Sequence, residues 1–205
     1  TVQDLSRPAV LTGFPSLDAV LGGFRPGNHI VAGALTSMGK TAFGLAVSRN
    51  VATGAGGQRS RPVLYISLEM SAAEIAGRTM CAEGSVSTAR ARRGSLTDED
   101  WKRLITAQNL VCEWPVWIED RRGLSVPEIA RLARDLTREM RTDLGLLVVD
   151  YLGLVGVKSG KRGQNREQEV AEISRTLKAL AGEIEAPVLT LAQLNRGAET
   201  EKDGP

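Results

Sequence analysis

Short runs of β-branched and leucine residues recur along this chain, and longer segments with helical periodicity separate them. We predict strands at residues 29–33, 63–67, 116–118, 146–149 and 188–191. Long amphipathic periods at 129–140 and 169–184 predict helices, each with one apolar face. Because strands alternate with helices, we expect an α/β fold, with a mainly parallel, twisted sheet covered by helices on both faces.

Polar residues mark where several helices should begin and end. Ser16 is a candidate cap for a short helix that stops at Gly22-Gly23. Residues 54–58 are glycine-rich and predict a flexible surface loop. We interpret the polar residues 1–12 as a linker and residues 13–205 as one domain. Three pairs have the spacing of a capping box, namely Ser71 with Glu74, Thr97 with Asp100, and Ser125 with Glu128.

The bulk composition fits one globular domain of 205 residues. Its 26 basic and 24 acidic residues leave a net charge of +2, so a polyanion site must come from local clustering. Cys81 and Cys112 have no paired spacing, and we expect reduced core thiols in a cytoplasmic protein. No apolar run reaches membrane-spanning length, and we expect no membrane association. The chain begins at Thr1 and ends on a polar run at Pro205, so we expect both ends to be cuts within a longer polypeptide.

Residues 34–41, ALTSMGKT, match the A-x-x-x-x-G-K-T form of a phosphate-binding loop. A predicted strand precedes the loop and an apolar helical run follows it, which is the context that the motif requires. Backbone N–H groups would surround a triphosphate, Lys40 would reach its β- and γ-phosphates, and Thr41 would hold Mg²⁺. The structural alternative is a turn of small residues between a strand and a helix. The predicted nucleotide-binding residues are Ser37, Met38, Gly39, Lys40, Thr41 and Ala42.

Three predicted strands are followed by a polar residue at the carboxyl edge of the sheet, where α/β folds bind ligands. Asp150 is placed to share Mg²⁺ with Thr41, although such an acid also commonly caps the next turn. Glu69 has two interpretations of equal weight: it deprotonates the water that attacks the γ-phosphate, or it stabilises the start of the next helix. Gln193 either contacts the γ-phosphate or begins a surface loop.

The segment 157–166 carries four cations, two glycines, no acid and no aromatic residue. Beside a nucleotide site, such a loop predicts contact with the phosphate backbone of a nucleic acid, independent of base sequence. A solvated loop is the alternative interpretation. The four candidate DNA-binding residues are Lys158, Lys161, Arg162 and Arg166.

Other residues that are capable of chemistry are assigned structural roles. The single histidine, His29, lies at a strand entrance, where we do not expect a general base. A basic cluster is interpreted as a solvated helix face or turn, and the three tryptophans as packing residues. These residues are Arg90, Arg92 and Arg93, and Trp101, Trp114 and Trp117.

Together these motifs resemble the C-terminal motor domain of bacterial replicative DNA helicases, the DnaB-like group with a RecA-type core. The resemblance runs from about Thr12 to Arg196, and a generic NTPase would share only the phosphate loop and the Asp150 strand. The most specific segments are SMGKTAF at 37–43, SLEMS at 67–71, VDYL at 149–152 and QLNR at 193–196.

The resemblance implies an ATP- and Mg²⁺-dependent motor that translocates on single-stranded DNA and unwinds duplex. It assigns Glu69 as the catalytic carboxylate, Asp150 as the metal-site acid, Gln193 as the γ-phosphate sensor, and 157–166 as the loop that grips DNA. The family forms a six-membered ring in which a neighbour supplies an arginine finger to the nucleotide. Primase and a helicase loader are further partners that the resemblance implies.

The chain departs from the family at several points. Leu35-Thr36 stand where Arg-Pro is usual, and Gly153 replaces a usual glutamine. The family's arginine finger lies beyond the QLNR motif, and its collar domain precedes the motor, so we expect the isolated fragment to hydrolyse ATP slowly. The alternatives are a RecA/RadA-like recombinase, a clock-type P-loop kinase, or a nucleotide-binding loader or scaffold without catalysis.

Overall fold

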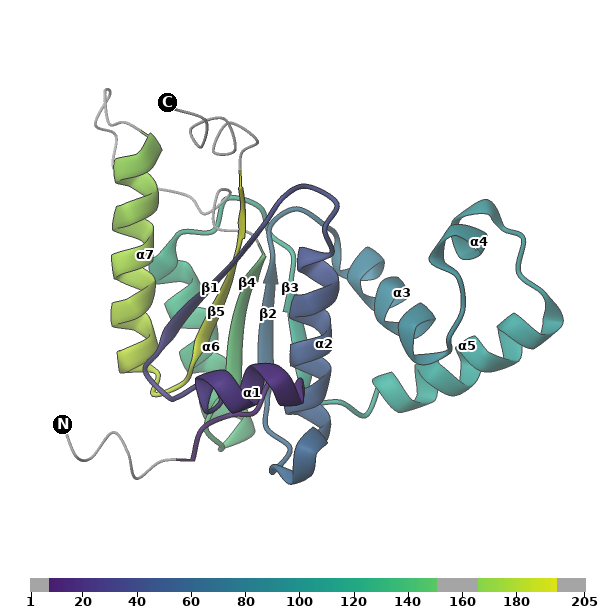
Figure 1. Ribbon diagram of the computed structural model, residues 1–205, viewed down its shortest axis with the longest axis horizontal. Coiled ribbons are helices and arrows are strands. Elements are labelled where there is room, and N and C mark those ends of the chain that lie inside the picture. The colour runs from purple at the N-terminus through teal and green to yellow at the C-terminus, as the bar shows by residue number, and fades with distance from the viewer. Residues whose placement is uncertain (1–7, 151–165, 195–205) are drawn as a thin grey trace, which may run out of the picture.

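Five parallel strands form one twisted sheet at the centre of the molecule (Figure 1). The computed structural model describes residues 8–150 and 166–194. The strand order is β1-β5-β4-β2-β3, so each connection is a crossover and the first strand lies at one edge. All five predicted strands are confirmed: β1 (His29–Ala34), β2 (Val63–Ser67), β3 (Val116–Glu119), β4 (Leu146–Asp150) and β5 (Val188–Gln193).

The burial of each strand follows from its place in the sheet. Every residue of β2 and β4 is buried, as expected for central parallel strands that helices cover on both faces. The edge strands β1 and β3 are only partly covered. Register then aligns the carboxyl ends, because Ser67 pairs with Asp150 and Ala34 pairs with Gln193. Polar residues from distant parts of the chain therefore meet at one rim.

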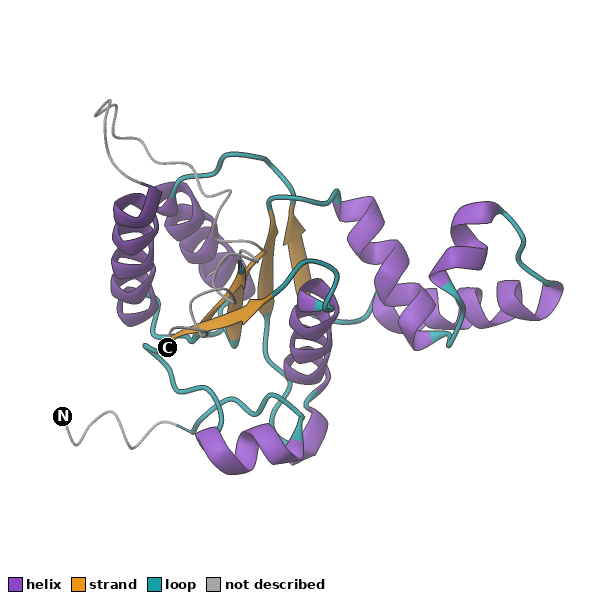
Figure 2. Ribbon diagram, turned by 45° about the horizontal axis from the view of Figure 1, so that its top comes forward, coloured by secondary structure: helices purple, strands orange, loops and turns teal. Residues whose placement is uncertain are grey.

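Helices cover both faces of the sheet, as predicted (Figure 2). On one face lies α2 (Lys40–Thr53), with the short α1 (Pro15–Leu21) beside it; on the other lie α6 (Val126–Met140) and α7 (Arg166–Glu183). The apolar side of α6 is buried through residues spaced three or four apart, including Val126, Ile129 and Ala133. Two hydrophobic clusters result, one on each face of the sheet.

Between β2 and β3, three helices form an arm that projects from the edge of the sheet (Figure 1). They are α3 (Ala72–Glu83), α4 (Thr88–Arg93) and α5 (Asp98–Val111). All three predicted capping boxes are confirmed, because the acidic side chain accepts a hydrogen bond from the N–H of Ser71, Thr97 and Ser125 in turn.

Two local predictions are wrong. Helix α1 begins at Pro15 with Phe14 as its N-cap, because the fixed φ of proline suits the first helical position and Ser16 already lies inside the helix. Residues 54–58 are not a loop throughout, since 55–57 make a 3₁₀ turn, although Gly56 and Gly57 lie at the surface as predicted. The Gln58 side chain holds both the N–H and the C=O of Leu11, each at 2.8 Å, which ties the start of the chain to the end of α2.

The arm also corrects three predictions about burial. Cys81 is buried as predicted, but Cys112 is exposed, and Trp101 on α5 is 55% exposed rather than packed. Arg92 and Arg93 are exposed on α4 as predicted, but Arg90 is only part-exposed, because it pairs with the buried carboxylate of Asp100 at 2.9 Å and so joins α4 to α5. Trp114 and Trp117 do pack against the hydrophobic clusters. No helix in 8–150 or 166–194 is long and apolar enough to cross a membrane.

His29 predicts a pH-dependent stability. Its Nε2 lies 2.9 Å from the Thr190 hydroxyl, and burial together with the charge of Lys178 lowers the pKa of its imidazole. Below pH about 6.5 the unfolded chain therefore binds more protons than the folded one, and the free energy of unfolding should fall as the pH drops through that value. Urea unfolding at pH 7.5 and 5.5 measures this fall. His29→Gln should reduce the difference, whereas an unchanged difference would assign the pH dependence to other groups.

Candidate functional site

The loop between β1 and α2 has the backbone shape of an anion site. Ser37 and Gly39 both have positive φ, at 66° and 85°, and Met38 N–H donates to the Leu35 carbonyl at 3.3 Å. Gly39 is the N-cap of α2 and supplies no side-chain cap. A Cβ at Gly39 would have no atom within 4 Å, so the approach to the helix is open. The first amide groups and the dipole of α2 thus lie at an open helix end, where a negative charge is stabilised.

Asp150 is the buried carboxylate next to this loop. Its Oδ2 accepts two hydrogen bonds, from Thr41 Oγ1 at 2.7 Å and from the Tyr65 hydroxyl at 2.9 Å. Its Oδ1 is buried and has no hydrogen-bond partner within the described part of the chain. A buried polar oxygen without a donor is unfavourable and rare, so this atom is suited to a cation or to a water that a cation holds. Oxygen ligands are those that Mg²⁺ prefers, and the donor set fits that ion.

Tyr65 belongs to this site although the sequence analysis did not single it out. It lies on β2 with no exposed surface. Burial and the charge of Asp150 raise the pKa of its phenol well above the ordinary value, so the hydroxyl remains a donor. The sequence carried part of the signal, because a phenol within an apolar buried strand requires a hydrogen-bond partner. That the partner is Asp150 follows only from the strand order, which places β4 beside β2.

Glu69 lies on the same rim, in the turn that follows β2. Ser67 shapes this turn, because its hydroxyl donates to the Met70 carbonyl at 2.7 Å. Leu68 N–H donates to the Asp150 carbonyl at 2.7 Å, which joins the turn to β4. The Glu69 side chain is exposed. The amino end of α3 is capped by other residues, namely Ser71, Glu74 and Asp120, whose carboxylate accepts from Ala72 N–H at 2.7 Å. These contacts argue against the interpretation that Glu69 stabilises the start of α3.

Gln193 contacts the phosphate loop itself. It is the last residue of β5, paired with Ala34, and its Nε2 donates to the Thr36 hydroxyl at 3.0 Å. The prediction placed Gln193 at the rim but did not identify Thr36 as its partner. This hydrogen bond joins the phosphate loop to the end of β5. A conformational change in either segment therefore acts directly on the other.

The predicted DNA-binding residues lie largely outside the described residues. This holds for Lys158, Lys161 and Arg162, while Arg166 is the first residue of α7.

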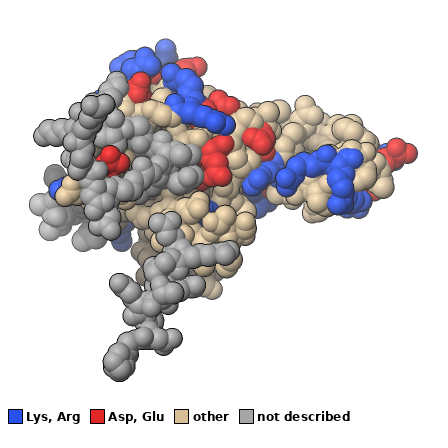
Figure 3. All heavy atoms as spheres, turned by 90° about the horizontal axis from the view of Figure 1, so that it is seen from above, with Lys and Arg blue, Asp and Glu red and all other residues tan. Residues whose placement is uncertain are grey.

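Viewed from above, Lys and Arg side chains run along the α3–α5 arm, with acidic side chains at its far end (Figure 3). These charges follow the sequence, because α4 ends in arginines and α5 begins with three acids.

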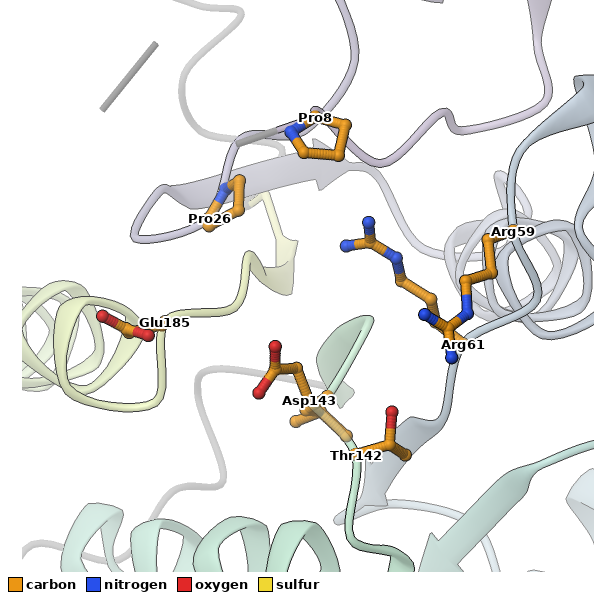
Figure 4. Close-up of a pocket in the computed structure, with 8 residues that line it drawn as sticks. Pro8, Pro26, Arg59, Arg61, Thr142, Asp143 and Glu185 are labelled. Atoms are coloured by element: carbon orange, nitrogen blue, oxygen red, sulfur yellow. The ribbon is translucent and has the colours of Figure 1, made fainter. Parts of the chain in front are cut away.

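A pocket of about 240 Å³ lies at the opposite end of the sheet (Figure 4). Arg59 and Arg61 line one side of it, and Asp143 and Glu185 line the other. These residues precede β2, β4 and β5, so the pocket is at the amino ends of the strands, whereas α/β folds bind their ligands at the carboxyl ends. This pocket is therefore not at the edge of the sheet that carries the phosphate loop and Asp150.

Comparison with known proteins supports the resemblance found in the sequence. The family model of the DnaB-like helicase C-terminal domain matches residues 9–205. The chain is 42% identical over 201 residues to the replicative DNA helicase DnaB of Geobacillus stearothermophilus, covering 98% of this chain and 43% of that protein. It is 41% identical over 192 residues to the replicative DNA helicase DnaC of Bacillus subtilis (strain 168), covering 94% and 41%. The chain thus spans less than half the length of these relatives.

Solved structures give the same result. A structure described as an ATPase domain matches with a TM-score of 0.84 and 29% identity, over 100% of this chain and 72% of that one. A DnaB-like replicative helicase, described with its interactions with primase, matches with a TM-score of 0.83 and 31% identity, over 96% and 47%. The predicted RecA-like α/β fold is confirmed.

Proposed function

The chain belongs to the family of DnaB-like helicase C-terminal domains, and from that premise we propose that it is the ATP-hydrolysing motor of a ring that translocates on single-stranded DNA and unwinds duplex. One observation carries the proposal: Thr41, at the start of α2, is hydrogen-bonded at 2.7 Å to a buried Asp150 whose second oxygen has no donor among the described residues. This pair joins the phosphate loop to the central strand, as a Mg–nucleotide site requires.

The residues of the rim have separate roles in the proposed hydrolysis. The amides of 37–42 and the ammonium of Lys40 bind and orient the phosphates. Thr41 and Asp150 would hold Mg²⁺, which would neutralise charge on the transferred phosphoryl group. Glu69 orients the attacking water and accepts its proton. Gln193 contacts the γ-phosphate or the water, and its hydrogen bond to Thr36 is exchanged as the nucleotide changes.

Partners complete the motor in this proposal. The segment 157–166 contacts the DNA backbone through its lysines and arginines, and the binding is independent of base sequence. Neighbouring copies of the intact protein form a six-membered ring and supply an arginine to the nucleotide, a contribution of roughly 10³–10⁵ in rate. Primase and a helicase loader are further proposed partners, and a single copy of this chain without its ring neighbours should hydrolyse slowly.

Stimulation by DNA tests the proposal directly. Phosphate release by the intact protein, measured with and without single-stranded DNA, should rise several-fold with DNA. The stimulation should weaken steeply with added salt, because phosphate contacts release counterions. Hydrolysis that single-stranded DNA leaves unchanged would favour a scaffold or another P-loop ATPase. Strand exchange without unwinding would favour a recombinase, and autophosphorylation a kinase.

A further inference from the structure

Tyr65 and Thr41 donate to the same oxygen of Asp150. The two bonds, at 2.9 Å and 2.7 Å, come from different elements, the phenol from β2 and the hydroxyl from the first turn of α2. The terminal torsion of an aspartate is broad and roughly two-fold, so a single donor restrains the carboxylate only weakly. Two donors on Oδ2 fix the orientation of the carboxylate. Oδ1 is then the oxygen without a donor in the described part of the protein.

Gly44 leaves the space in which the phenol lies. It is buried on the sheet-facing side of α2, one turn after the phosphate loop. A Cβ at this position would lie 3.3 Å from the Tyr65 hydroxyl oxygen and 3.0 Å from Leu191 Cδ1. Glycine in a helix interior costs about 0.5–1 kcal/mol relative to alanine, so its presence here has a packing reason. The helix, the phenol and the carboxylate therefore form one packed unit.

We propose that Tyr65 is a positioning residue for the divalent cation of the nucleotide, and that it acts by holding the Asp150 carboxylate in the orientation that leaves Oδ1 as the oxygen available to the ion. This inference rests on the proposed function, because it names a further determinant of the same site. Thr41 has two roles there: its oxygen is a predicted ligand of the cation, and its hydroxyl donates a hydrogen bond to Asp150. With Tyr65 present, the carboxylate has a second restraint that does not depend on Thr41.

Tyr65→Phe in the intact protein tests the proposal through binding rather than turnover. The ring stays and only the hydroxyl is lost, so the strand should remain packed. Binding of a fluorescent ATP analogue is titrated first in EDTA and then with increasing Mg²⁺ or Mn²⁺. We expect the cation concentration for half-maximal tightening to rise about 10-fold, within the 10–100-fold range for partners that orient metal ligands. Affinity in EDTA should change by less than about twofold, because the Tyr65 hydroxyl is bonded to Asp150 and not to a phosphate-binding amide.

A matched control separates positioning from general stability. Thr190→Val removes one buried hydroxyl from neighbouring β5, where the Thr190 hydroxyl lies 2.9 Å from His29 Nε2. It should lower the unfolding midpoint and leave the cation titration unchanged. If Tyr65→Phe behaved in the same way, with lower stability and the wild-type cation dependence, Tyr65 would be structural only. If the wild-type protein bound no nucleotide with Mg²⁺, the proposed function itself would fail instead.

Gly44 gives a second test of the same carboxylate, through the Tyr65 phenol that it contacts. Gly44→Ala should displace the phenol and raise the cation requirement in the wild-type background. In the Tyr65→Phe background the hydroxyl is gone, so adding the methyl group should have little further effect. A double-mutant cycle on the cation midpoint measures this coupling. Fully additive shifts would overturn the packing link between Gly44 and Tyr65.

Discussion

Glu69→Gln in the intact protein is expected to lower ATP turnover by about 10²–10⁴-fold, the range for a positioned general base. The amide keeps the size and exposure of the side chain but cannot accept the proton of the attacking water. Nucleotide affinity should be nearly unchanged, because Glu69 lies in the turn after β2 and the phosphate loop is contributed by β1 and α2. Steady-state phosphate release and equilibrium binding of an ATP analogue, measured on the same samples, check both parts.

Glu113→Gln is the matched control for this variant. Glu113 is another exposed carboxylate, in the turn between α5 and β3, and is not at the rim. Its substitution should leave turnover within about twofold of wild type, as expected for a surface change. If Glu69→Gln turned over ATP at the wild-type rate, Glu69 would have no part in the chemistry and its role would be structural. Loss of binding together with turnover would show that Glu69 holds the nucleotide rather than the water.

The central strands were predictable because their chemistry leaves little choice. A run such as 146–149 is apolar without interruption, which suits a parallel strand covered on both faces. The capping boxes were equally local, since a serine or threonine and an acid three residues apart satisfy each other. Asp150, Glu69 and Gln193 could be placed at one rim for the same reason, because parallel strands present their carboxyl ends together.

The partners of those rim residues could not be predicted, because they depend on register and packing between distant segments. Tyr65 and Asp150 are 85 positions apart, and Gln193 and Thr36 are 157 positions apart. Gln58, within a glycine-rich segment that suggested mobility, bonds a backbone 47 positions away. The prediction that Cys112 and Trp101 are buried was wrong for a different reason. An arm that projects from the sheet has too little neighbouring chain to cover its apolar side chains.

Lys40→Ala is expected to weaken binding of ATP by about 10–100-fold, since a hydrogen bond to a charged group contributes roughly 1.5–3 kcal/mol. Turnover should fall with it, because the ammonium also stabilises charge on the phosphoryl group that is transferred. Equilibrium titration with ATP and ADP analogues measures the loss. We expect a larger loss for ATP, since Lys40 is predicted to reach the γ-phosphate, which ADP lacks.

Lys102→Ala is the control, because Lys102 is an exposed lysine on α5 in the projecting arm and carries the same charge. It should bind both nucleotides as the wild-type protein does. Lys40→Ala and Glu69→Gln together separate a motor from a scaffold, because a scaffold needs only binding and would tolerate Glu69→Gln. If hydrolysis by the intact protein survived both substitutions, the phosphate loop at 34–41 would not be the site of the reaction, and the motor proposal would have to be abandoned.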